Sequence, residues 1–292
     1  LEFRRVLFRS EYIVSVDGVP TREVQNFYQL LENKAGRLVK LGLNSKPSAD
    51  GVRFVDVKAQ ASEEGLRYLD WVHQRRAMVD KLSGGRIGYI HLPNTLFEGN
   101  RELFKQFPAQ IAKEALIVDD RYNGGGFIPD RMIEILARKP LNYWKRRGLE
   151  PQAQPFLSHR GPKAMLINGL SSSGGDALPF YFRELKLGTL IGTRTWGGLI
   201  GVSGNPGLVD GGTVTAATFR FMDKDGKWAV ENEGVSPDIE VIDTPHLVAQ
   251  GRDPSLEKAV EVLLVELQKN PVKPIVAPEA PSNFGKPGQP LD

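Results

Sequence analysis

Short apolar runs and longer amphipathic stretches alternate along the middle of the chain. The runs "IGYIHL", "ALIVDD", "KAMLINGL" and "GTLIG" have the length and composition of buried strands, and "PDRMIEILARK" and "DALPFYFREL" have the apolar spacing of helices. Buried strands that alternate with helices predict a layered α/β domain with a largely parallel sheet. We place this domain at residues 86–270, where "PSLEKAVEVLLVELQK" forms the closing helix.

A different pattern precedes this domain, in residues 11–60. The order predicted there is a strand, a turn at Asp17 and Gly18, a helix from about Val24 to Leu31, and a second strand. The second strand is marked by apolar residues at alternate positions, namely Val39, Leu41 and Leu43. These features predict a small β-rich module.

Four further segments complete the organisation. Residues 61–85 have apolar residues at helical spacing after an N-cap at Ser62, and predict a connecting helix. Residues 210–241, inside the larger domain, have the alternation of a β-rich region. Residues 271–292 are rich in proline and predict an extended tail. Residues 1–10, "LEFRRVLFRS", resemble a translated linker or a cloning scar.

Composition and charge exclude several classes of protein. The 292 residues are 40% hydrophobic and 25% charged, which is typical of a globular chain. Most of the formal charge of +3 lies in residues 1–10, so basicity is no argument for a nucleic-acid partner. No apolar run approaches the roughly 18 residues that span a bilayer, so no membrane partner is expected. The chain has no cysteine, and its four histidines lack metal-ligand spacing, so we expect neither a metal nor a cofactor.

The stretch "LINGLSSSGGDALPFYFREL" places three serines between a predicted strand and a predicted helix. A serine at such a corner, followed by small residues, can be approached by a substrate carbonyl and act as a nucleophile. The same stretch is also compatible with a serine-rich N-cap loop. On these residues alone, both interpretations stay open.

Several motifs that follow one another along the chain favour the nucleophile interpretation, because together they resemble a known family. Three loops, "DDRYNGGG", "NGLSSSGGD" and "VENEGVSPD", each follow a predicted strand, and the chain also contains "LRYLDWV", "GYIHLP", "GTRTWGG" and "LVDGG". Together they resemble the catalytic core of tricorn-type serine peptidases, relatives of the tail-specific proteases with a ClpP/crotonase-like fold. Residues 11–60 resemble the C-terminal half of a PDZ domain.

The resemblance implies roles for individual residues. It makes Ser173 the nucleophile, with Ser171 and Ser172 serving loop structure and helix capping. The oxyanion hole would be formed by the backbone amides of Gly174 and Gly125, with Gly124 as the alternative to Gly125. Glu231 would orient the catalytic base.

The base itself has no clear candidate in the sequence. Gly198 stands where tail-specific proteases have a lysine, and the tricorn branch uses a histidine upstream of the PDZ module. The chain is therefore expected to be a fragment that lacks its general base. His91 is the only substitute that a motif suggests, and a packed structural role is favoured for it. After the "LARK" helix, archaeal tricorn has an aspartate that suits basic side chains of the substrate. Residues 141–148 of this chain contain no acid, so a preference for cleavage after Lys or Arg is not expected.

The expected function is that of a serine endopeptidase or oligopeptidase, which cleaves peptides or unfolded proteins through an acyl-enzyme. One alternative is a catalytically silent PDZ and crotonase-like peptide-binding scaffold, and another is a crotonase-like acyl-CoA enzyme. The resemblance further implies a homo-oligomer in the full-length parent. It favours the cytoplasm, with the periplasm as the alternative.

Overall fold

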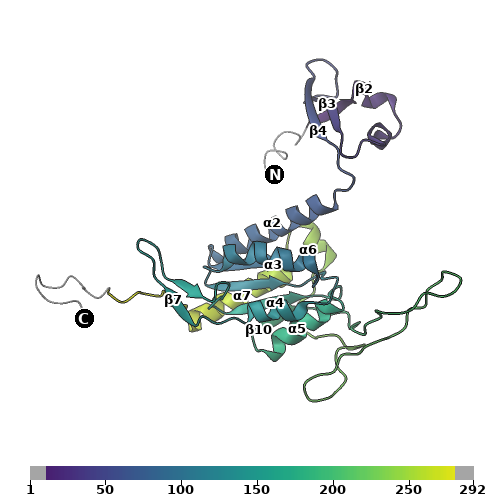
Figure 1. Ribbon diagram of the computed structural model, residues 1–292. Coiled ribbons are helices and arrows are strands. Elements are labelled where there is room, and N and C mark those ends of the chain that lie inside the picture. Colours follow the sequence, from purple (N-terminus) through teal and green to yellow (C-terminus); the bar gives the residue numbers. More distant parts are fainter. Residues whose placement is uncertain (1–10, 280–292) are drawn as a thin grey trace, which may run out of the picture. The chain divides into compact units, whose positions relative to one another are not determined.

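The computed structural model describes residues 11–279 (Figure 1). The chain divides into two compact units, and the boundary between Trp71 and Val72 falls within helix α2 (Glu64–Ser83). Residues 271–279 contain no helix or strand. The expected linker at residues 1–10 and the remainder of the predicted tail lie outside the described residues.

The N-terminal unit is built on a four-stranded antiparallel sheet in the order β2-β1-β3-β4. Its strands are β1 (Tyr12–Val16), β2 (Val19–Pro20), β3 (Leu38–Asn44) and β4 (Arg53–Lys58). The predicted turn joins β1 to β2. Asp17 and Gly18 have φ values of 48° and 84°, as the tight turn of a two-residue β-hairpin requires.

The predicted helix from Val24 to Leu31 is wrong. The chain instead forms two short 3₁₀ helices, η1 (Thr21–Glu23) and η2 (Phe27–Leu31). Neither has a buried residue, so no packing surface stabilises a longer α-helix there. The side chain of Asn26 accepts a hydrogen bond from the Tyr28 amide, which begins a new turn within the predicted helix.

Five parallel strands form the sheet of the larger unit, in the order β11-β10-β9-β6-β5. They are β5 (Ile87–His91), β6 (Ala115–Asp119), β9 (Lys163–Ile167), β10 (Gly188–Gly192) and β11 (Ile239–Glu240). Every residue of β5, β6 and β9 is buried, as expected when both faces of a parallel sheet are covered. The predicted α/β class with a parallel sheet is confirmed.

Helices cover the sheet and position its functional loops (Figure 1). They are α3 (Phe97–Gln110), α4 (Pro129–Leu136), α5 (Gly174–Glu184), α6 (Pro245–Ala249) and α7 (Pro254–Lys269). Helix α7 packs on β6, β9 and β10, and α5 packs on β9, β10 and α4. A small hairpin of β7 (Asn142–Trp144) and β8 (Gln152–Gln154) lies outside the main sheet. Because β6 and β9 are parallel neighbours, the loops that follow them emerge side by side.

The prediction of a β-rich region at residues 210–241 is wrong. The only strand found there is β11, and much of the preceding segment forms long loops that extend from the sheet (Figure 1). Single bridges join three residue pairs: Gly201 and Phe219, Gly207 and Thr213, and Met222 and Trp228. Most side chains of these loops are exposed, so no packed surface stabilises the alternating residues as a sheet.

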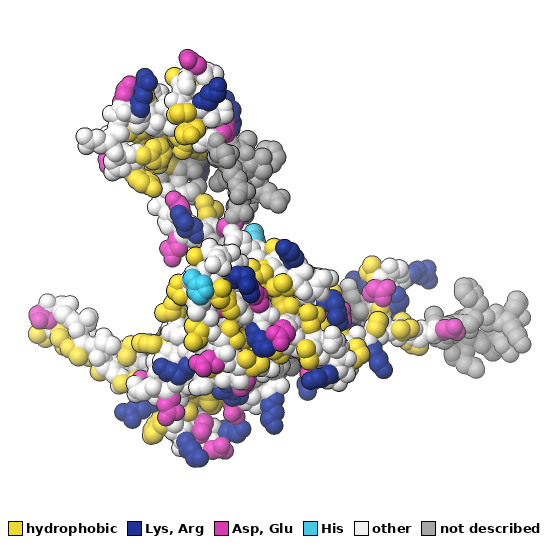
Figure 2. Space-filling model, turned by 180° about the vertical axis from the view of Figure 1, so that it is seen from behind, with side chains coloured by type: hydrophobic (Ala, Val, Ile, Leu, Met, Phe, Trp, Pro, Cys, Tyr) yellow, Lys and Arg dark blue, Asp and Glu magenta, His cyan; other side chains and the backbone are white. Residues whose placement is uncertain are grey.

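Acidic and basic side chains are interspersed over the larger unit on the face shown in Figure 2. This surface carries no extended region of one charge on that face. Among residues 11–279, none of the helices combines the length and apolar character that a membrane crossing needs.

Candidate active site

Ser173 lies at the corner between strand β9 and helix α5. It is the N-cap of α5 and has φ 55° and ψ −115°, a conformation that is strained for a residue other than glycine. Its side chain makes no capping hydrogen bond, and within residues 11–279 its hydroxyl has no hydrogen-bond partner. The residue is half-buried. A strained, unpaired serine at a strand-to-helix corner has the geometry of an accessible nucleophile.

The first amides of α5 follow directly. The carbonyl of Ser173 accepts hydrogen bonds from the amides of Asp176 (2.8 Å) and Ala177 (3.0 Å), whereas the Gly174 amide has no acceptor in the described part of the chain. A Cβ atom on Gly174 would lie 2.0 Å from the buried Thr95 hydroxyl, so only glycine fits there. A free amide at a helix N-terminus is suited to stabilise an oxyanion beside Ser173.

The other two serines hold the loop in place. Ser171 is buried, donates its hydroxyl hydrogen to the Asp120 carbonyl (2.8 Å), and accepts the Trp196 amide on its own carbonyl (2.9 Å). The Ser172 amide donates to the carbonyl of Asn123 (2.9 Å). Ser171 therefore connects the serine loop to the loop after β6, and the N-cap position of α5 is occupied by Ser173.

The glycine loop after β6 contacts the serine loop closely. Gly125 has φ 81°, and a Cβ atom there would lie 2.6 Å from the Ser172 carbonyl oxygen and 2.7 Å from the Ser173 Cβ. The Gly125 amide donates to Asn123 Oδ1 (2.9 Å), and the Gly124 amide donates to the Pro93 carbonyl (3.0 Å). The Gly126 amide has no acceptor among residues 11–279.

Asn123, which the sequence did not single out, connects the two loops. It is fully buried, and its side chain accepts from the Gly125 amide and donates to Asp120 Oδ1 (2.8 Å). Its backbone carbonyl accepts from Ser172. Gly175 packs against it so closely that a Cβ atom would lie 2.7 Å from the Asn123 carbonyl oxygen. Asn123 therefore fixes the position of the glycine loop relative to the serine loop.

Two adjacent buried aspartates below these loops have opposite pKa shifts. Burial by itself would raise the pKa of Asp119, but the charge of Arg121 and its 2.7 Å hydrogen bond outweigh burial and hold that pKa below its usual value. Asp120 has no such cation, and burial raises its pKa well above the usual range. Its Oδ2 atom is buried without a partner among the described residues.

The loop at residues 195–200, which follows β10, is fixed to the start of α5 through Asp176. This buried carboxylate accepts hydrogen bonds from the Thr195 hydroxyl and from the Gly197 amide (2.8 Å). Burial raises its pKa. The Trp196 amide also donates to Ser171, so this loop lies against the serine loop.

Glu231 is hydrogen-bonded to the loop at residues 195–200. Its Oε2 atom accepts the amides of Leu199 and Ile200, both at 2.7 Å. Both hydrogen bonds that the Glu231 side chain accepts from residues 11–279 are to Oε2, which leaves Oε1 without one. Leu199, whose amide binds Glu231, lines one pocket together with Gly174, the first residue of α5.

The four histidines lie in surroundings that differ from this site. His91 is buried with its Nε2 atom 2.9 Å from the Arg121 carbonyl, and burial lowers its pKa. His159 is also buried, with Nε2 2.9 Å from the Lys113 carbonyl, and burial lowers its pKa to about 4. His73 and His246 are exposed. No hydrogen bond joins any of the four to Ser173 in the described structure, and the packed role of His91 is confirmed.

Metal ligands do not gather at this site. Within residues 11–279 there is no group of three or more His, Asp or Glu side chains arranged to hold a metal ion. The polar groups that lie together are instead a serine hydroxyl, backbone amides and buried carboxylates. These are groups that can bind and attack a carbonyl.

Comparisons with known proteins match most of the chain. The model of peptidase family S41 matches residues 86–241, more than half of the chain. The chain is 37% identical over 259 residues to the tricorn protease of Thermoplasma volcanium, covering 88% of this chain and 25% of that protein. It is 38% identical over 262 residues to tricorn protease homolog 1 of Streptomyces coelicolor, covering 89% and 24%.

A solved structure extends this likeness to three dimensions. A crystal structure of the tricorn protease matches with a TM-score of 0.80 and 36% identity, over 88% of this chain and 25% of that chain. The chain thus spans about a quarter of the length of the relatives that it matches.

Proposed function

The chain belongs to peptidase family S41, and on that premise we propose that it forms the nucleophile-bearing part of a serine peptidase that cleaves peptides. Ser173 Oγ adds to the scissile carbonyl carbon, and its proton passes to a base that returns it to the leaving amine. Water then hydrolyses the ester on Ser173 by the same route. No cofactor enters this scheme.

One observation carries the proposal: the strained Ser173, with its unpaired hydroxyl, lies immediately before the free Gly174 amide at the start of α5. A hydroxyl used only for capping would bond to the following amides, and this one does not. Backbone strain at an unpaired polar side chain is characteristic of functional sites.

The second oxyanion donor comes from the glycine loop. The resemblance favours Gly125, with Gly124 as the alternative, but both amides have acceptors within the chain. Gly126 supports a revised assignment, because its amide has no acceptor among the described residues and it lines the same pocket as Gly174. We therefore propose Gly174 and Gly126 as the donors, with Gly125 shaping the loop between them.

The general base in this proposal is a histidine outside the 292 residues. Two of the four histidines are buried on backbone carbonyls, and no hydrogen bond joins any of them to Ser173 in the described structure. Glu231 Oε1 has no donor among residues 11–279 and would accept the second ring N–H of that histidine.

The proposal also includes self-association of the full-length parent. Sedimentation of that protein would measure it.

The same observation favours one alternative, a catalytically silent peptide-binding scaffold. The serine and the oxyanion amides would then bind a peptide carbonyl without turnover. This alternative expects the full-length parent to bind peptides and to leave them uncleaved.

Peptide hydrolysis by the full-length parent distinguishes the two functions. We expect turnover that falls by at least about 10⁴-fold in Ser173→Ala, because the nucleophile is lost while the oxyanion donors remain. Ser172→Ala is the matched control and should retain most of the activity. Turnover that is unchanged in Ser173→Ala would contradict the proposal, and binding without turnover would favour the scaffold.

A further inference from the structure

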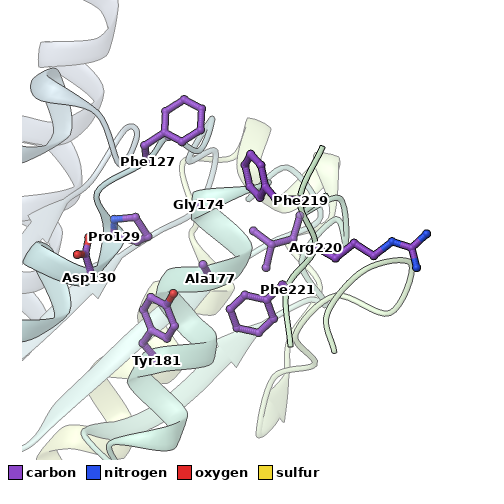
Figure 3. A pocket seen from close by; sticks show the side chains of 11 residues that line it. Phe127, Pro129, Asp130, Gly174, Ala177, Tyr181, Phe219, Arg220 and Phe221 are labelled. Atoms are coloured by element: carbon purple, nitrogen blue, oxygen red, sulfur yellow. The ribbon is translucent and has the colours of Figure 1, made fainter. Parts of the chain in front are cut away.

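A pocket of about 300 Å³ lies beside Gly174 (Figure 3). One wall is formed by Gly174, Ala177 and Tyr181, whose spacing of three and four residues places them on one face of α5. Phe219 and Phe221 face this wall from the long loops that follow β10. Gly174 and Ala177 leave space on the helix side because they are small, and the rings of Phe219 and Phe221 line the other side.

The aromatic wall is held by contacts of its own. The Phe221 ring packs edge-on against Phe180, with ring centroids 5.0 Å apart. The ring of Phe219 lies over Gly201, where a Cβ atom would be only 1.6 Å from its Cζ atom, and the Gly201 amide donates to the Phe219 carbonyl (3.0 Å). Both phenylalanines therefore make contacts within the chain as well as lining the pocket.

Charged groups of the pocket lie at its edges. The Arg220 guanidinium extends away from the rings and lies 5.6 Å from the centroid of the Trp228 ring (Figure 3). Asp130 is exposed and lies beside Pro129 at the opposite edge. A charged side chain between the two phenylalanine rings would lose water and could meet an opposite charge only at the edges of the pocket, where Arg220 and Asp130 lie, so an apolar side chain is favoured between the rings.

We propose that this pocket receives an aromatic or large aliphatic side chain of the peptide residue whose carbonyl Ser173 attacks. The inference rests on the proposed function, because it takes Gly174 as an oxyanion donor. A carbonyl held at Gly174 places the neighbouring side chain at the mouth of the pocket. The volume lies at the lower end of the roughly 300–1,000 Å³ of small-molecule sites, so it suits a single side chain.

The test measures binding of product-like peptides to the 292-residue chain, so it requires no turnover. The probes are acetyl-Ala-Ala-Phe, acetyl-Ala-Ala-Leu, acetyl-Ala-Ala-Lys and acetyl-Ala-Ala-Asp, each with a free carboxylate. Amide NMR shifts of Gly174, Ala177 and Leu199 report occupancy of the pocket. We expect the Phe and Leu peptides to bind at least about tenfold more tightly than the Lys and Asp peptides, since apolar pockets discriminate by factors of roughly 10 to 200.

Two variants and one control assign the preference to the pocket. Phe219→Ala removes a half-exposed ring and should reduce the preference about tenfold, and Ala177→Leu should fill the space and abolish it. If Ala177→Leu fails to fold, Phe219→Ala alone decides. Trp144→Ala deletes an exposed aromatic ring on β7, away from the pocket lining, and should change nothing.

The outcomes separate this inference from the proposed function. Equal or tighter binding of the Lys peptide, or an unchanged preference in Phe219→Ala, would overturn the pocket assignment even if the parent cleaves peptides at Ser173. Selective binding of the Phe peptide that shifts the pocket amides would support it even if no turnover occurs.

Discussion

The two units of the chain differ in how far they bury their own side chains. Among residues 11–71 of the N-terminal unit the fully buried apolar residues are Val16, Val39 and Leu43, whereas Leu38 and Phe54 are 71% and 61% exposed. Hydrophobic side chains gather on its surface in the view of Figure 2. In the larger unit, by contrast, three whole strands are buried and joined to the helices in one apolar cluster.

The geometry of the candidate site depends on the larger unit. The serine and glycine loops both follow strands of the buried sheet, and their contacts with each other run through buried groups such as Asn123. A rigid scaffold of this kind fixes functional loops. The N-terminal unit has little core to transmit strain, so the loops should keep their geometry when it is perturbed.

The largest effect on the free energy of unfolding is expected from a Leu→Ala substitution in the larger unit, with the same substitution in the N-terminal unit for comparison. Leu116→Ala in β6 should lower the free energy of unfolding of the larger unit by about 2–5 kcal/mol, because it leaves a cavity at a fully buried site. Leu43→Ala in β3 is the matched control and should leave that transition unchanged. Hydrogen exchange of β6 amides measures both, and equal effects would break the comparison.

A substitution in the glycine loop tests the close packing at the site. Gly125→Ala should cost about 1–3 kcal/mol, because it forces a side chain into positive φ and toward the Ser172 carbonyl. Gly124→Ala is the matched control, since a Cβ atom there meets nothing within 4 Å. Thermal unfolding measures the difference, and similar values for the two variants would show that the loops are not tightly packed.

The buried Asp120 should give the larger unit a distinctive pH dependence. Its folded-state pKa is raised by burial, so its contribution to stability is present below the unfolded value of 3.8 and is lost as pH rises through the folded value. Asp120→Asn keeps an oxygen for Asn123 and removes this loss. The variant should match the wild type near pH 3 and gain about 1.4 kcal/mol per pH unit between the two pKa values.

Asp119 supplies the control for that experiment, because its folded-state pKa is lowered. It contributes stability above its unfolded pKa, and that stability is lost as pH falls through the folded value. Asp119→Asn should therefore destabilise the protein at neutral pH. Denaturant unfolding from pH 3 to pH 8 measures both variants, and shifts of the same sign would contradict the assignment.

The smallest expected effect concerns Glu231. Glu231→Gln keeps an acceptor for the amides of Leu199 and Ile200 but loses the charge, which should cost about 1 kcal/mol. Faster hydrogen exchange at those two amides, with β6 unchanged, is the expected result. Unchanged exchange at both amides would show that Glu231 does not hold this loop.

The sequence predicted the parallel α/β core because the strands buried on both faces appear as continuous apolar runs. It failed in the segment at residues 210–241, where alternating residues do not reveal whether a neighbouring strand exists. It also failed at Val24 to Leu31, where helical spacing did not show that no surface would pack against the helix.

At the candidate site, resemblance identified the loops but not which amides are free. Gly124, Gly125 and Gly126 are the same residue type, so the sequence does not distinguish their amides. The hydrogen bonds that do distinguish them are made to Asn123 and to the distant Pro93. The signal for Asn123 is its position as the first residue of "NGGG", because an asparagine in a glycine loop often hydrogen-bonds the backbone two residues further on. The aromatic wall of the pocket was also missed, since Phe219 lay in a presumed strand.

The central claim is that Ser173 is the nucleophile of a site built by the buried sheet. The most direct measurement is labelling of the full-length parent with a fluorophosphonate, followed by mass-spectrometric mapping of the adduct. We expect one adduct, on Ser173, which persists in Ser172→Ala and disappears in Ser173→Ala. An adduct on Ser171 or Ser172, or labelling that survives Ser173→Ala, would contradict it.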